Sequence, residues 1–253
     1  MTSQLPRAAP ARFEVRVLPG LDSLAEEAAR EFDHAVSDAL RDRVVFRVAL
    51  SGGSTPRSLH ERLAAKPYRT RIAWERIRFF FGDERCVPPD HERSNFRMAR
   101  ETLFDPLRIP SAHVFRMRGE ADPPAAAAEY ARTLVSEFAR SRSGPRFDLV
   151  FLGLGPDGHT ASLFPGTKAL EERARLVVAN YVPKFREWRL TSTYRLLNAA
   201  RRVVFLAAGE EKREPVNKIL KREPGWRKLP ASGIHPQRGT LLWLLDEEAG
   251  RDL

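Results

Sequence analysis

The chain has 253 residues, of which 42% are hydrophobic and 30% charged, and this composition is that of a globular protein rather than a disordered or fibrous one. Its single cysteine, Cys86, excludes an intramolecular disulfide and a thiolate zinc site, so we expect a reducing, cytoplasmic setting. The sequence has neither the apolar core of a signal peptide at its start nor an apolar run approaching ~18 residues, so we expect no membrane partner.

The net charge of +10 raises the alternative of a nucleic-acid-binding protein. The cationic residues are 7 lysines and 36 arginines, spread along the whole chain and interleaved with acids. No run of five or more positive charges, zinc-finger spacing or aromatic RNA-binding pattern occurs. We therefore expect no nucleic-acid partner, and we interpret the charge as a solvated surface whose field favours small anionic molecules.

Short apolar runs alternate with amphipathic segments along the chain. We expect strands over residues 13–18, 44–50, 77–81, 147–154, 175–179, 202–208 and 240–245. We expect helices over residues 21–40, from Pro56, from Phe96, over 124–140, after residue 212 and at the C-terminus. Strands of continuous Val, Ile, Leu and Phe separated by helices predict a three-layer α/β/α fold with a mostly parallel sheet. No repeat or long linker divides the chain, so we expect one domain over residues 1–253.

Polar loops follow four of the predicted strands: SGGST (51–55), GDER (82–85), GLGPDGH (153–159) and GEEK (209–212). In open α/β sheets, ligands bind beyond the carboxyl ends of the strands. We therefore expect these loops to lie at one edge of a single parallel sheet and to line one pocket.

The first of these loops, Ser51-Gly52-Gly53-Ser54-Thr55, connects a strand to a helix. Two glycines allow close approach of a ligand, the hydroxyl groups can donate hydrogen bonds, and a helix N-terminus favours an anion, as in a phosphate-binding loop. A tight turn with a capping serine is the alternative. Pro56 occupies the last glycine position of a serine-hydrolase G-x-S-x-G motif and excludes that motif.

The loop from Gly153 to Gly158 matches the spacing G-x-G-x-x-G of dinucleotide-binding proteins. Asp157 would place a negative charge against the pyrophosphate, and Phe164-Pro165-Gly166 interrupts the following helix too early. An acidic residue about 20 positions on, which would bind the ribose, is also missing. We therefore expect no dinucleotide cofactor.

His159 directly follows this loop, beside Asp157, and histidine is the side chain best matched to proton transfer near neutral pH. We expect His159 to be a catalytic base. Which of Asp83, Glu84 and Asp157 supports it is left open by the spacing.

Charged residues also follow the strand at 77–81. Asp83 and Arg85 form either an internal ion pair or the rim of a pocket, and the planar guanidinium of Arg85 suits a phosphate group. Arg189 and Lys212 are two further cations expected at the same edge. No group of His, Asp and Glu has the spacing of metal ligands, so we expect no metal.

Several of these segments, in this order, resemble the 6-phosphogluconolactonases. They are ALSGGSTPRSLHERLA, RFFFGDERCVPPDHERSNFRMARETLF, FDLVFLGLGPDGHTASLFPG, RLTSTYRLLNAARRVVFLAAGEEK and LPASGI with TLLWLLDEEA. The first is shared with related sugar-phosphate isomerases and deaminases. Glucosamine-6-phosphate deaminases typically carry DGHIAFNEPG where this chain has DGHTASLFPG, which favours the lactonase over the deaminase or isomerase alternative.

The resemblance implies a fold of the glucosamine-6-phosphate deaminase and ribose-5-phosphate isomerase group. It also implies a metal-independent carboxylic ester hydrolase that converts 6-phospho-D-glucono-1,5-lactone to 6-phosphogluconate, the second step of the oxidative pentose phosphate pathway. His159 would be the base that activates water. The catalytic residues that we expect are His159 and Asp157, and the acid that supports His159 stays open among Asp83, Glu84 and Asp157. The residues expected to bind substrate or phosphate are Ser51, Gly52, Gly53, Ser54, Thr55, Asp83, Arg85, Arg189 and Lys212.

This chain departs from the family in the segment Phe185-Arg186-Glu187-Trp188, which is bulkier and more charged than the small, Pro-rich segment expected before Arg189. Ser192 is a smaller departure, at a position where the family tends to be apolar. The oligomeric state is left open by the sequence, and a monomer is compatible with it.

Overall fold

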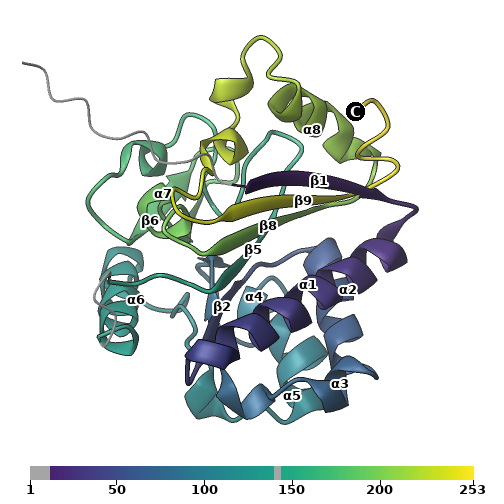
Figure 1. Ribbon diagram of the computed structural model, residues 1–253. Coiled ribbons are helices and arrows are strands. Elements are labelled where there is room, and N and C mark those ends of the chain that lie inside the picture. Colours follow the sequence, from purple (N-terminus) through teal and green to yellow (C-terminus); the bar gives the residue numbers. More distant parts are fainter. Residues whose placement is uncertain (1–11, 140–143) are drawn as a thin grey trace, which may run out of the picture.

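A six-stranded sheet with the order β1-β9-β8-β5-β2-β3 forms the centre of the molecule (Figure 1). The computed structural model describes residues 12–139 and 144–253. The strands are β1 (Arg12–Leu18), β2 (Phe46–Leu50), β3 (Ile77–Phe81), β5 (Leu149–Gly153), β8 (Arg202–Ala207) and β9 (Thr240–Asp246). Every neighbouring pair in this sheet is parallel, which confirms the predicted parallel sheet.

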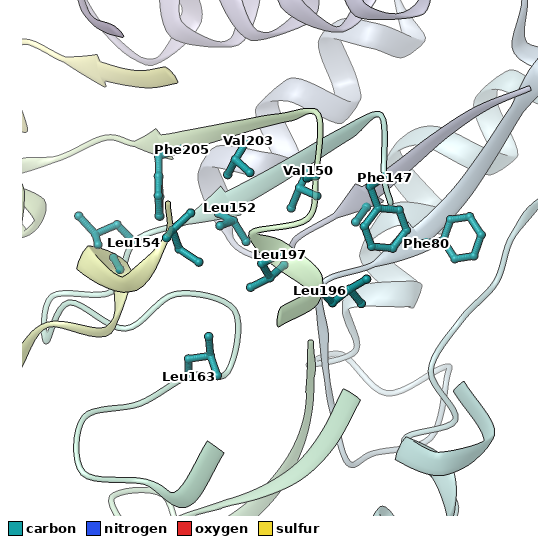
Figure 2. Close-up of a cluster of buried hydrophobic side chains, with 14 of the residues drawn as sticks. Phe80, Phe147, Val150, Leu152, Leu154, Leu163, Leu196, Leu197, Val203 and Phe205 are labelled. Atoms are coloured by element: carbon teal, nitrogen blue, oxygen red, sulfur yellow. The ribbon is translucent and has the colours of Figure 1, made fainter. Parts of the chain in front are cut away.

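The inner strands β2, β5, β8 and β9 are mostly apolar because both faces of the sheet are covered, whereas the edge strand β1 includes Glu14 and Arg16. Within β5, Val150 and Leu152 belong to one hydrophobic cluster, whereas Leu149 and Phe151 belong to the cluster on the other face. Figure 2 shows the first cluster, which extends from Phe80 and Phe147 at one end to Leu154 and Leu163 at the other.

Helices from different parts of the chain cover the two faces. The long helices α1 (Leu21–Asp42) and α2 (Ser54–Ala64) supply residues to one cluster, and α6 (Pro123–Glu137) and α8 (Arg213–Leu220) supply residues to the other. In Figure 1, α1 and α8 lie on opposite sides of the sheet. The remaining helices are short: α3 (Tyr68–Arg71), α4 (Asn95–Ala99), α5 (Asp105–Leu107) and α7 (Tyr194–Leu197). The layers confirm the predicted α/β/α class.

A second sheet of three antiparallel strands corrects the prediction of a single sheet. It has the order β4-β7-β6, with β4 (Asp83–Arg85), β6 (Val177–Val182) and β7 (Glu187–Ser192). The strand expected at 175–179 is β6, and it pairs with β7, for which the sequence predicts no strand. The pattern of β7 is misleading because its polar residues are buried: Thr191 and Ser192 are both 0% exposed.

The prediction of a C-terminal helix is wrong, because residues 247–252 form turns. The carboxylate of Asp246 accepts a hydrogen bond from the N–H of Ala249 at 2.8 Å, and the N–H of Gly250 donates to the Asp246 carbonyl at 2.9 Å. The helix expected over 124–140 is α6, which ends at Glu137, and residue 140 lies outside the described residues. Among the described residues, no helix combines the length and the apolar character needed to cross a membrane.

Candidate active site

A cavity of about 290 Å³ lies at the carboxyl ends of the central strands, where β2, β3 and β5 end and β8 leads into the loop before Lys212. It brings together eight of the residues expected from the sequence, namely Ser51, Gly52, Gly53, Asp83, Arg85, His159, Arg189 and Lys212. The expected convergence of the four loops is therefore observed. Ser54, Thr55 and Asp157 do not line the cavity: Ser54 and Thr55 form the first turn of α2, and Asp157 contacts His159.

His159 is held on two sides. Its Nδ1 lies 2.5 Å from Oδ1 of Asp157, and its ring stacks on Phe164 with a centroid distance of 4.1 Å and an interplanar angle of 25°. A ring that donates from Nδ1 to a carboxylate keeps Nε2 as its proton acceptor. The contact with Asp157 and the stacking on Phe164 therefore fix the orientation of the His159 ring, an arrangement that suits proton transfer.

The glycines of this loop make room for the histidine. A Cβ at Gly155 would lie 1.9 Å from Nδ1 of His159. Gly158 has a φ of +74°, and a Cβ there would lie 2.7 Å from Cβ of Leu229. The glycine spacing therefore has another cause than a dinucleotide, because Gly155 packs against the His159 ring and Gly158 packs against Leu229.

Asp157 carries a negative charge throughout the neutral range. Burial acts to raise the pKa of its carboxyl, but the hydrogen bond with His159 and the ion pair with Lys184 outweigh burial and hold this pKa below its usual range. Nζ of Lys184 lies 3.1 Å from Oδ2 of Asp157. Lys184, at the tip of the β6–β7 hairpin, was missed by sequence reasoning because only the fold brings residue 184 to residue 157.

The two other acids considered from the sequence have different partners. Oδ2 of Asp83 accepts a hydrogen bond from the hydroxyl of Ser162 at 2.6 Å. Oε1 of Glu84 accepts from the backbone N–H of Asn95 at 2.7 Å, and Oε2 accepts from that of Phe96 at 2.8 Å, so Glu84 caps α4. Of the three acids, Asp157 is the one in contact with His159.

Two arginines lie side by side in the cavity wall. Arg85 in β4 and Arg189 in β7 are directly opposite each other in the antiparallel pair. Burial, followed by the charge of Arg85, lowers the pKa of Arg189. Within the described part of the chain, Nε of each arginine is buried without a hydrogen-bond partner. Two adjacent guanidinium groups with unused donors favour an anion such as a phosphate group.

The turn after β2 adds hydrogen-bond donors near these cations. A Cβ at Gly52 would lie 1.8 Å from Oδ1 of Asn95, so only glycine fits there without movement. Gly53 has a φ of +112° and precedes the first residue of α2, so the capping position expected for a serine is occupied by glycine. Oγ of Ser51 is buried and, among the described residues, has no hydrogen-bond partner. This turn therefore offers a hydroxyl and a helix N-terminus to a bound anion.

Among the lining residues that were not predicted are Asn95, Phe164 and Phe185. Phe164 and Phe185 meet edge to face at 5.6 Å and 80°, and the guanidinium carbon of Arg189 lies 5.7 Å from the centre of the Phe185 ring. Phe185 belongs to the segment 185–188 that departs from the family pattern. Its bulk, noted from the sequence, was the available signal that this segment borders the site.

Comparisons with known proteins agree with the geometry. The family model described as glucosamine-6-phosphate isomerases/6-phosphogluconolactonase matches residues 19–243. The 6-phosphogluconolactonase of Synechocystis sp. is 43% identical over 242 residues, which covers 95% of this chain and 98% of that protein. The rat 6-phosphogluconolactonase is 37% identical over 247 residues, covering 96% of this chain and 95% of the relative.

Solved structures show the same fold. The 6-phosphogluconolactonase from Trypanosoma brucei superimposes with a TM-score of 0.83 at 30% identity and covers 96% of this chain and 99% of that one. A monomeric glucosamine-6-phosphate deaminase has a TM-score of 0.78 at 22% identity, covers 94% of this chain and 99% of that one, and shares the fold. This chain therefore belongs to the glucosamine-6-phosphate isomerase/6-phosphogluconolactonase family.

Proposed function

We propose that this protein is a 6-phosphogluconolactonase, which hydrolyses 6-phospho-D-glucono-1,5-lactone to 6-phosphogluconate in the second step of the oxidative pentose phosphate pathway. The observation that carries the proposal is the meeting of a His159–Asp157 pair with Arg85, Arg189 and Lys212 around one cavity. The relatives that bear this enzyme name over almost the whole chain support it.

His159 acts as the general base in this proposal. Nε2 takes a proton from a water molecule, whose oxygen forms a bond to C1 of the lactone. The bond between C1 and the ring oxygen then breaks, and the proton returns from the imidazolium to that oxygen. General-base assistance of this kind contributes about 10²- to 10⁴-fold. Asp157 stabilises the imidazolium and holds the ring in place.

The cations hold the other end of the substrate. Arg85, Arg189 and Lys212 bind the phosphate group, with Asp83 and the Ser51–Thr55 turn completing the binding surface. Fixing the phosphate at a distance from His159 places C1 over the imidazole, which converts binding into orientation of the reacting atoms. Ser54 and Thr55 contribute through the first turn of α2, since they do not line the cavity.

We further propose that the enzyme acts in the cytoplasm as a single lactonase domain over residues 1–253, without a metal and without a nucleic-acid partner. The lone Cys86 supports a reducing compartment, and the dispersed arginines support a solvated surface rather than a nucleic-acid interface.

The decisive experiment follows the disappearance of freshly prepared 6-phosphogluconolactone, with glucosamine 6-phosphate as the parallel substrate. We expect rapid lactone hydrolysis well above the spontaneous rate and no ammonia from the amino sugar. Ammonia release without lactone hydrolysis would instead identify a deaminase. Loss of affinity for nucleic acid with rising salt, in a filter-binding titration, would support the nucleic-acid alternative.

A further inference from the structure

The two arginines of the cavity wall repel each other. Arg85 and Arg189 occupy directly opposed positions on β4 and β7, and like charges in such pairs destabilise a sheet. Burial increases this effect, because the Arg189 side chain is only 10% exposed. A nearby negative charge is needed to hold both guanidinium groups in one arrangement before a phosphate group arrives.

Asp83 and Glu187 both supply negative charge near Arg189, and Glu187 is the one that forms an ion pair with its guanidinium group. It lies two residues before Arg189 on β7, and residues two apart on a strand project from the same face. Oε1 of Glu187 pairs with Nη2 of Arg189, and Oε2 pairs with Nη2 of Arg93. Burial would raise the pKa of Glu187, but Arg93 and Arg189 together lower it, so the carboxylate is ionised near neutral pH.

Arg93 completes a connection between the two cavity arginines. Its guanidinium binds Glu187, while its backbone carbonyl accepts a hydrogen bond from Nη1 of Arg85. Glu187 therefore holds Nη2 of Arg189, and the Arg93 carbonyl holds Nη1 of Arg85. The Nε atoms of Arg85 and Arg189, buried and without a partner among the described residues, are left as donors for a ligand.

We infer that Glu187 is a positioning residue for phosphate binding. It holds the guanidinium group of Arg189 directly and that of Arg85 by way of Arg93, so that both are in place before a phosphate dianion binds. The inference rests on the proposed function and adds to it a residue from the segment in which this chain departs from its family. Glu187 does not line the cavity, so it acts through the arginines rather than on the substrate. Arranging donors before binding increases affinity because less freedom is lost when the ligand binds.

The test uses two single variants, Glu187→Gln and Glu187→Asp. It also uses one double variant that carries both Arg93→Glu and Glu187→Arg and so exchanges the two charges. For Glu187→Gln we expect KM for the phosphorylated lactone to rise about 5- to 20-fold, as for the loss of one charge-assisted contact, with kcat within about threefold. The inhibition constant of inorganic phosphate rises in parallel. Hydrolysis of unphosphorylated D-glucono-1,5-lactone, which has no phosphate to anchor, is unchanged, and Glu187→Asp restores part of the affinity.

The charge exchange separates positioning from simple cross-linking. It preserves an ion pair between positions 93 and 187 but removes the carboxylate from Arg189, so we expect KM to stay high. Recovery of wild-type KM in the exchanged protein would overturn the inference, since the pair would then only join the loop to the strand. A lower KM in Glu187→Gln would also overturn it, because the carboxylate would then compete with phosphate.

Two controls complete the design. Glu101→Gln makes the same change in an exposed Arg97–Glu101 pair whose residues do not line the cavity, and it should leave KM unchanged. Calorimetric titration of wild type and Glu187→Gln with inorganic phosphate tests the inference even if the wild type does not hydrolyse the lactone. In that case the proposed function fails, while a weaker phosphate affinity in the variant still supports the role of Glu187.

Discussion

The two sheets of the molecule contribute to the same cavity in different ways. The six-stranded sheet contributes turns at the ends of buried strands, which carry Ser51, His159 and Lys212. The three-stranded sheet contributes side chains from within its strands, namely Arg85 and Arg189. The first region is stabilised by apolar packing on both faces, whereas the second contains buried charges that need partners.

This difference separates the chemistry from the binding. His159 is paired with its own acid, and the strand that precedes it is buried in the hydrophobic core. The two arginines lie opposite each other on β4 and β7, and among the described residues the Nε of each has no hydrogen-bond partner. We therefore expect changes at the His159–Asp157 pair to affect kcat and changes at the two arginines of the three-stranded sheet to affect KM. Each prediction below tests this division, beginning with the largest expected effect.

Replacement of His159 by alanine should lower kcat by about 10²- to 10⁴-fold with little change in KM, because the base is lost while the cations remain. Steady-state kinetics measure the loss of kcat and thermal melts measure the stability of the fold, with His34→Ala, an exposed histidine on α1, as the control. A lowered melting temperature with normal turnover would show that His159 only stabilises the turn.

Replacement of Arg85 by alanine should act mainly on substrate capture. Loss of one charge-assisted phosphate contact should lower kcat/KM by a factor equivalent to about 1.5–3 kcal/mol of binding free energy. Most of this loss should be in KM, because the contact exists in both the ground state and the transition state. The unphosphorylated lactone should be affected much less. If KM stays at the wild-type value while kcat collapses, Arg85 stabilises the transition state and the division between the two sheets fails.

Replacement of Asp157 by asparagine should lower kcat by about 10- to 100-fold, the range seen when a group that orients a functional histidine is removed. KM should change little, because Asp157 does not line the cavity. An unchanged kcat would show that packing on Phe164 alone orients the ring.

The same variant tests the pH dependence of stability. The pKa of Asp157 is lowered in the folded state, so its ionised form stabilises the fold at pH values above the unfolded pKa, which is about 3.9. That contribution is lost as the pH falls through the folded pKa. The difference in unfolding free energy between wild type and Asp157→Asn should therefore shrink as the pH falls below about 4. Denaturant titrations between about pH 5 and about pH 2 measure it, and a difference that grows over this range would contradict the assignment.

Replacement of Lys184 by methionine should have the smallest effect. The Lys184 side chain is 57% exposed, and exposed ion pairs contribute about 0–1 kcal/mol, so kcat should fall by no more than about fivefold. Lys168→Met, at another exposed lysine, is the matched control. A loss as large as that of Asp157→Asn would mean that Lys184 takes part in the proton transfer itself.

Most of the fold could be predicted from local pattern. The six predicted strands of the central sheet are all observed, and the inner ones coincide with mostly apolar runs because both of their faces are covered. The three-stranded sheet could not be predicted in this way, since β7 buries threonine and serine whose partners are distant loops. The N–H of Ser162 donates to the hydroxyl of Thr191 at 3.2 Å, and that of Ser192 to the carbonyl of Gly82 at 2.8 Å.

The sequence by itself determined the central sheet, the loops that follow its strands, and the residue types required for a base and an anion site. Parallel strands end at a common edge, so local order along the chain is enough to bring His159 near Ser51 and Lys212. Only the tertiary structure decided which acid supports His159 and which residues order the arginines. Those choices depend on the hairpin that carries Lys184 and Glu187 to partners far away in the chain, and an ion pair between distant residues leaves no periodic signal in the sequence.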